Sequence, residues 1–128
     1  MGDLSAHSLL TPLLLTHLCL FRQLNLTNSG LCGVWVEYGT QKGEYNAEGI
    51  NAIADALRVN GALTKLSLAH NKLEEKGTKA ICEALEKNTT LKELDIRGDI
   101  GGSNTGGPAG AKHVAKMVRV NGALTEVR

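Results

Sequence analysis

Aromatic side chains are scarce in this sequence, with one Phe, one Trp and two Tyr among 128 residues. Because such rings normally fill much of a core, this core must come from Leu, Ile, Val and Ala in thin, repetitive layers. Cys19, Cys32 and Cys82 are an odd number without framework spacing, which excludes a disulfide scaffold and predicts an intracellular, cytoplasmic protein with reduced thiols. The formal net charge is +1, which predicts neither a nucleic-acid partner nor a membrane partner.

A long hydrophobic run is absent as well. The apolar stretch over residues 9–21 is interrupted and too short to span a membrane. The segment before it carries Asp3 and no basic residue, and no small-residue cleavage site follows, so a signal peptide is disfavoured. We predict instead that residues 1–20 form an N-terminal capping helix, which starts at Asp3 or Ser5 and is kinked or interrupted at Pro12.

The spacings that catalytic or metal chemistry requires are also missing. His17 and Cys19 lie near each other, but no second ligand pair with zinc spacing accompanies them. There is no nucleophile motif and no pair of carboxylates placed across a pocket, and the glycine-rich stretch over 101–110 lacks the Gly-Lys-Ser/Thr of a phosphate-binding loop. We therefore predict that the protein is not an enzyme and has no metal and no cofactor.

An internal repeat is what the sequence does contain. Residues 63–73 match L-x-x-L-x-L-x-x-N-x-L throughout, and the pattern starts again at Leu91, 28 residues later, and at Leu124. An earlier copy starts at Phe21. Between the copies, apolar residues recur at i, i+3 and i+4, the stripe of an amphipathic helix. Each repeat therefore predicts a strand followed by a helix.

Stacking is the way for these units to bury both their strand leucines and their helical stripes. We predict an α/β leucine-rich-repeat solenoid with parallel strands on its concave face and helices on its convex face. The strands are expected near residues 21–27, 63–69, 91–97 and 124–127. The helices are expected to close in the left-handed conformation that Asn and Gly tolerate, at Asn60-Gly61, Asn88-Thr89 and Asn121-Gly122.

The 28-residue unit with a full helix resembles the ribonuclease-inhibitor-like class of leucine-rich repeats. That class includes the repeats of NOD-like immune receptors and of the Ran GTPase-activating protein. The resemblance covers roughly residues 21–128 and implies a short right-handed α/β horseshoe that holds another protein. Because the class binds many unrelated partners, the resemblance does not identify this one.

The first break in the repeat is an insert over residues 33–46, 14 residues beyond the 28-residue period. Alternation over residues 34–38 predicts a short strand, and Gly39 and Gly43 predict turns, so we expect a hairpin-like flap. The flap either contacts a partner or folds over the first repeat as a shield, since amphipathic aromatic residues serve both uses. It holds every Trp and Tyr of the chain, and these are candidate partner-binding residues: Trp35, Tyr38 and Tyr45.

Two further breaks lie toward the C-terminus. The glycine-rich stretch over 101–110 adds five residues, with Asp99 where the repeat has asparagine, and predicts a surface loop that is flexible or orders on a partner. In the last repeat, Leu124 and Val127 would face an open end, which a neighbouring subunit could cover.

The exposed face of the strands supplies the remaining candidate site. Residues between the core leucines point to this face, and in-register neighbours offer two ion pairs, Lys65 with Glu93 and Asp95 with Arg128. The candidate partner-binding residues here are Gln23, Asn25, Lys65, Ser67, Glu93, Asp95 and Arg97, with Thr27 and Ala69 on the same face. The predicted function is a protein-interaction module or adaptor; the alternatives are a structural subunit of a large assembly and a GTPase-activating or other regulatory protein.

Overall fold

The computed structural model describes residues 22–98 and 103–128. The predicted N-terminal capping helix over residues 1–20 lies outside the described residues. The elements in chain order are β1 (Gln23–Asn25), β2 (Val34–Glu37), β3 (Thr40–Gly43), α3 (Glu48–Val59), β4 (Lys65–Ser67), α4 (Glu74–Leu85), β5 (Glu93–Asp95), α5 (Gly107–Val120) and β6 (Glu126–Val127).

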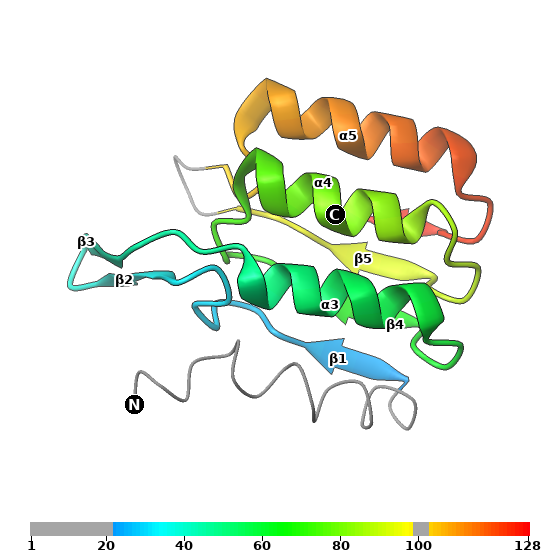
Figure 1. The fold of residues 1–128 in the computed structure, drawn as a ribbon, viewed down its shortest axis with the longest axis horizontal. Helices are drawn as coiled ribbons and strands as arrows, with labels where there is room; N and C mark the ends of the chain where they lie inside the picture. The colour runs from blue at the N-terminus through cyan, green and yellow to red at the C-terminus, as the bar shows by residue number, and fades with distance from the viewer. Residues whose placement is uncertain (1–21, 99–102) are drawn as a thin grey trace.

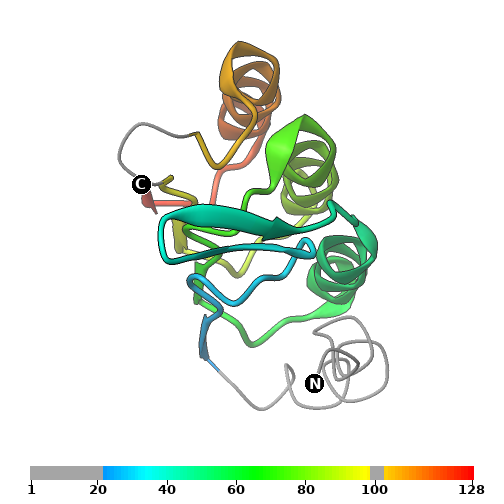
Figure 2. The same ribbon diagram turned by 90° about the vertical axis from the view of Figure 1, so that its left-hand side faces the viewer.

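The repeat strands form one parallel sheet in the order β1-β4-β5-β6. Their register places Leu24 opposite Leu66, Leu66 opposite Leu94 and Leu94 opposite Val127, so the repeat leucines lie in one row. The helices α3, α4 and α5 lie side by side on one face of this sheet, with α4 in the middle (Figures 1 and 2). The predicted α/β leucine-rich-repeat fold is confirmed.

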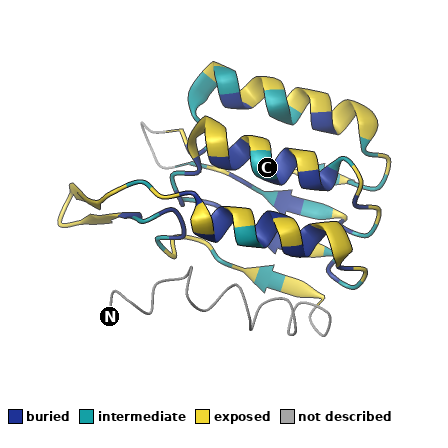
Figure 3. Cartoon of the chain, viewed as in Figure 1, coloured by how far each residue is buried: buried dark blue, intermediate teal, exposed yellow. Residues whose placement is uncertain are grey.

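The core lies between the sheet and the helices. Leu66 and Leu94 of the strands meet Ile53 and Ile81 of the helices, and all four side chains are fully buried. Figure 3 shows buried and exposed residues alternating along α3 and α4, as expected of helices with one buried side. Each such side chain stabilises the fold by about 1.5–3 kcal/mol relative to exposure, which is why the stripes need stacking.

Asparagine side chains close the helix-to-strand turns. The Oδ1 atom of Asn88 accepts hydrogen bonds from the backbone N–H groups of Thr90 and Leu91, at 2.9 and 2.8 Å. Its Nδ2 atom donates to the carbonyl oxygen of Leu57 in the preceding repeat, at 2.9 Å. One buried amide therefore shapes its own turn and ties it to the neighbouring helix end.

Asn60 and Asn121 shape their own turns in the same way, through their Oδ1 atoms. Their backbones are extended, with φ of −80° and −85°, so the predicted left-handed helix closure is wrong. The Oδ1 atom accepts the backbone N–H groups of the turn, so the chain leaves the helix without a left-handed residue. Nδ2 of Asn121 donates to the carbonyl oxygen of Leu85 at 2.6 Å, whereas the buried Nδ2 of Asn60 has no acceptor among the described residues.

A second row of asparagines lies at the strand-to-helix edge. It corrects the prediction that Asp99 stands at the asparagine position of the repeat. The Nδ2 atom of Asn71 donates to the carbonyl oxygen of Leu26 at 2.7 Å, and Nδ2 of Asn104 donates to that of Leu68 at 3.0 Å. Oδ1 of Asn104 also accepts the backbone N–H of Asn71, at 3.1 Å. Asn104 is thus the asparagine of its repeat, and the prediction that Asp99 replaces it is wrong because the inserted residues precede it.

The helix α5 begins inside the glycine-rich stretch. Residues 107–110 form its first turn, so the predicted loop over 101–110 extends too far. Pro108 suits this turn because its missing N–H has no helical partner there. At Gly110 a Cβ atom would lie 1.6 Å from the carbonyl oxygen of Thr105, so this helix start requires glycine.

Candidate functional site

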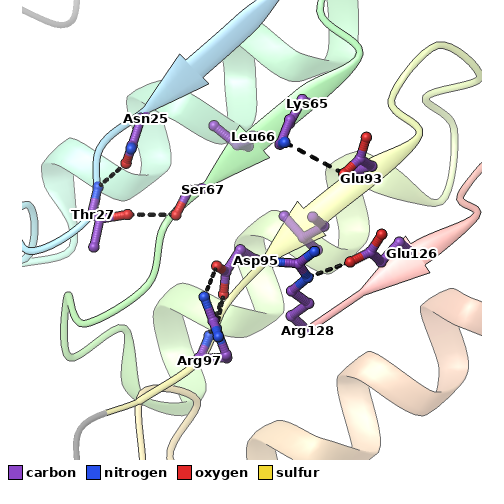
Figure 4. Close-up of a pocket in the computed structure, with 11 residues that line it drawn as sticks. Asn25, Thr27, Lys65, Leu66, Ser67, Glu93, Asp95, Arg97, Glu126 and Arg128 are labelled. Carbon is purple, nitrogen blue, oxygen red and sulfur yellow. Dashed lines mark hydrogen bonds and ion pairs between the residues drawn. The ribbon is translucent and has the colours of Figure 1, made fainter.

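A groove crosses the exposed face of the parallel sheet and receives side chains from all four strands and the residues that follow them (Figure 4). Its volume is about 220 Å³. It is lined by Asn25, Thr27, Lys65, Leu66, Ser67, Glu93, Leu94, Asp95, Arg97, Glu126 and Arg128. The structure therefore gathers the strand-face candidates with two exceptions: Gln23 is exposed on β1 outside the groove lining, and Ala69 does not line the groove either.

At the uncharged end of the groove, hydroxyl and amide groups satisfy one another. The hydroxyls of Thr27 and Ser67 lie 2.6 Å apart, and Oδ1 of Asn25 accepts the backbone N–H of Thr27 at 2.9 Å. Ala69, expected on the exposed face, is buried. The chain turns after β4, where His70 has a φ of +57°, so strand alternation no longer sets the side of Ala69.

A bidentate ion pair lies at the charged end. The Nε atom of Arg97 donates to Oδ1 of Asp95 at 3.0 Å, and Nη2 donates to Oδ2 at 2.8 Å. Burial raises the pKa of the Asp95 carboxyl, but the hydrogen bonds and charge of Arg97 outweigh this and hold that pKa below its usual value. Asp95 is therefore an anion at neutral pH whose charge is already neutralised.

The other charges of the groove are paired too. Lys65 Nζ lies 3.6 Å from Glu93 Oε1, which confirms the predicted pair across neighbouring strands. Arg128 lies beside Asp95 as the register predicts, and its charge helps to lower the pKa of that carboxyl, but the predicted ion pair does not form because Arg128 pairs with Glu126, two residues back in the chain. Three cations therefore balance three anions: Lys65, Arg97 and Arg128 against Glu93, Asp95 and Glu126.

The insert forms the predicted hairpin, in which β2 and β3 pair antiparallel. It projects beyond the layer of helices (Figure 1). Tyr38 and Gly39 at its tip have φ of +50° and +78°, the conformation of a tight two-residue hairpin turn. The side chains of Tyr38 and Trp35 are 98% and 46% exposed, so these two rings are open to a partner.

Tyr45, the third aromatic candidate, fastens the insert to the body. Its hydroxyl donates to the carbonyl oxygen of Leu73 at 2.6 Å, and its ring packs against the core. Burial, together with the nearby thiol of Cys32, raises the pKa of Tyr45 to about 12. The three aromatic candidates are thus divided between an exposed pair and a packed residue.

Two thiols lie in the core of the described residues. Cys32 and Cys82 are buried free thiols, and burial raises the pKa of each to about 12, so both are neutral and unreactive at physiological pH. Within residues 22–98 and 103–128, no group of three or more His, Cys, Asp or Glu residues could hold a metal ion. No helix in that part of the chain is long and apolar enough to cross a membrane.

A second groove lies at the helix-to-strand edge, and the leucine pattern does not point to it. It has a volume of about 450 Å³ and is lined by Arg22, Gly61, Ala62, Thr64, Thr89, Thr90 and Lys92. Position in the repeat could have indicated this groove. The residues immediately before β1, β4 and β5 are Arg22, Thr64 and Lys92, and stacking of the repeats brings them into one row.

Comparison with known proteins supports the fold. No protein-family model matches the sequence, and no curated protein matches it. The solved structure of actin-binding site 2 of leiomodin-1 is similar, with a TM-score of 0.64 and 18% identity, over 89% of this chain and 58% of that one. The tropomodulin C-terminal domain of Caenorhabditis elegans has a TM-score of 0.62 and 14% identity, over 100% of this chain and 64% of that one.

This chain therefore spans less than two thirds of either similar structure. The likeness agrees with the ribonuclease-inhibitor-like leucine-rich-repeat fold expected from the sequence.

Proposed function

We propose that this chain is a non-catalytic protein-binding module in which the groove on the sheet and the exposed tip of the hairpin hold a segment of another protein. The observation that carries the proposal is the groove itself, which crosses all four strands above buried leucines. One similar structure is the actin-binding site 2 of leiomodin-1, so actin is the first partner to test. We place the module inside the cell because Cys32 and Cys82 are buried as free thiols.

Filling the groove is the sharpest test. Ser67→Tyr would place a ring at the centre of the lining, while Asp55→Tyr would place one on the outer side of α3, away from the groove. In co-sedimentation with filamentous actin, and in affinity capture with the full chain as bait, we expect Ser67→Tyr to abolish binding and Asp55→Tyr to retain it. Equal binding by both variants would exclude the groove.

The hairpin is tested separately. Trp35→Ala removes a large exposed ring, and such residues commonly contribute about 2 kcal/mol at an interface, roughly 30-fold in affinity. Val59→Ala, at an exposed apolar residue of α3, is the matched control. Unchanged capture by Trp35→Ala, with an unchanged circular dichroism spectrum, would leave the ring without a binding role.

A structural role within a larger assembly is the second candidate, favoured by the last repeat. Val118 is 49% exposed, whereas the equivalent residues Leu57 and Leu85 of the earlier helices are 0% exposed. Val127 of β6 is 37% exposed, and its strand has a free edge within the described residues. A neighbouring subunit would cover this apolar end. Size-exclusion chromatography with light scattering separates the two ideas, because a clean monomer at high concentration argues against this one.

A further inference from the structure

The helix-to-strand groove differs from the sheet groove in its charge. Arg22 and Lys92 line it, no acidic residue does, and neither cation has an ion-pair partner within residues 22–98 and 103–128. In the sheet groove three cations and three anions cancel. An acidic ligand therefore gains little in the sheet groove and meets two unneutralised cations in the helix-to-strand groove.

The cations are not needed by the helix ends nearby. Helix C-termini attract cations through their free carbonyl groups. Here the carbonyl oxygen of Leu57 already accepts from Nδ2 of Asn88, and that of Asn60 accepts from Asn88 and Thr90. Arg22 and Lys92, moreover, precede strands rather than end helices. Their positive charge therefore remains available to a ligand.

Hydrogen-bond donors accompany the charge. The backbone N–H groups of Gly61 and Thr89, two residues of the lining, have no acceptor in the described part of the chain. Both residues directly follow the turn asparagine of their repeat, Asn60 or Asn88, and so occupy equivalent places. Cations flanked by free backbone N–H groups suit carboxylate ligands.

Spacing selects the shape of that ligand. Arg22 and Lys92 precede β1 and β5, which lie two strands apart in the sheet order. Adjacent strands are about 4.8 Å apart, so the two backbones are roughly 10 Å apart. In a polyproline-type segment, residues i and i+3 lie on one side about 9 Å apart, which matches this distance.

We propose that the helix-to-strand groove binds an extended acidic segment of a partner protein, with carboxylates at i and i+3 paired to Arg22 and Lys92. The inference rests on the proposed protein-binding function and names the chemistry of a partner segment at a second surface. Charge complementarity carries it: the groove offers two cations and free donors and holds no anion.

Nitrogen-15 NMR titration of the full chain tests this directly. The probe is the peptide Gly-Glu-Pro-Pro-Glu-Gly, whose prolines favour the extended form, and its control is Gly-Gln-Pro-Pro-Gln-Gly. We expect the amide signals of Gly61 and Thr89 to shift with the Glu peptide and not with the Gln peptide. No shift up to millimolar Glu peptide would overturn the proposal.

Two matched double variants distinguish binding in this groove from a general effect of net charge. The double variant Arg22→Gln/Lys92→Gln is expected to weaken the Glu peptide at least about tenfold, as for the loss of charge-assisted contacts. Lys79→Gln/Lys112→Gln removes the same net charge from exposed helix residues and should change the Kd less than about twofold. Equal weakening by both double variants would reduce the effect to net charge and refute the proposal.

Inorganic phosphate and a single-stranded RNA oligonucleotide complete the titration. Tighter binding of either, with the same amide shifts, would overturn the assignment to an acidic protein segment. The two proposals are tested by separate measurements, because peptide binding reports on the helix-to-strand groove and partner capture by Ser67→Tyr reports on the sheet groove. Partner capture by the unaltered chain without binding of the Glu peptide would refute the second surface alone. Undiminished capture by Ser67→Tyr, with the Glu peptide still bound, would refute the sheet groove alone.

Discussion

Asn88→Ala should be among the most damaging single substitutions in this chain, although it removes little apolar surface. The amide serves the backbone N–H groups of Thr90 and Leu91 and the carbonyl group of Leu57. Leaving a buried polar group unsatisfied costs about 1–3 kcal/mol. Water can reach the half-buried Thr90, so its share lies at the low end, and the sum over the three groups is about 3–7 kcal/mol. Whole domains are stable by about 5–15 kcal/mol, so the variant should be severely destabilised.

Asn121→Ala provides the matched control. Asn121 makes the equivalent bonds in the last repeat, but its surroundings are half-buried, so water can replace the lost amide. We expect a loss of about 1–2 kcal/mol there. Urea unfolding of the full chain, followed by circular dichroism at 222 nm, measures both. Equal losses in the two variants, or a loss below about 1 kcal/mol for Asn88→Ala, would refute the view that buried amides hold the repeats together.

Three further predictions concern single sites. Gly110→Ala should destabilise by about 2 kcal/mol or more in the same urea assay, because its Cβ would strike the carbonyl oxygen of Thr105, whereas Gly122→Ala, with open space around it, should be nearly neutral. Cys32, with its pKa raised to about 12, should resist iodoacetamide at pH 8 until urea unfolds the chain, as peptide mapping would show. Because the folded pKa of Asp95 is lowered, its stabilisation is present at neutral pH and lost as pH falls through that pKa; Asp95→Asn should flatten the acid limb of the urea midpoint against pH.

The stacking of strands and helices could be predicted because it depends on few residue types at regular spacing. Leu66 and Leu94 recur 28 residues apart, and the same step separates Ile53 from Ile81. A strand or helix with one apolar side has no other way to bury it, so the parallel neighbours β4 and β5 follow from the pattern. The hairpin was predictable for a similar reason, since alternation over 34–38 bounded by glycines is a local signal.

The roles of asparagine were harder to predict. Asn60 and Asn88 look like ordinary helix-stop residues, because the sequence shows the residue type and not the carbonyl groups that stacking brings near it. Asn104 was missed because an insertion shifted it relative to the repeat, and alignment by residue count selected Asp99 instead. Hydrogen bonds between repeats depend on tertiary placement, so periodicity alone cannot assign them.

Side-chain pairing on the surface was only partly predictable. Register correctly placed Lys65 beside Glu93. It also placed Arg128 beside Asp95, but Arg97, two residues further along the chain and just beyond β5, reaches the carboxylate with two hydrogen bonds. Long arginine side chains choose among several neighbours at similar distance, and exposed pairs differ by less than about 1 kcal/mol. Sequence register therefore predicts which charged residues are neighbours but not which of them form ion pairs.

Leucines and asparagines hold the fold, so the residues just before each strand are free to carry other chemistry. Arg22, Thr64 and Lys92 occupy equivalent places and differ in character without changing the core. Exposed charges a nanometre apart repel each other only weakly at physiological salt, so the two cations cost the fold little. Neutralising them should therefore leave the unfolding free energy within about 0.5 kcal/mol. Any loss of acidic-peptide binding in that variant can then be assigned to the groove and not to a damaged solenoid.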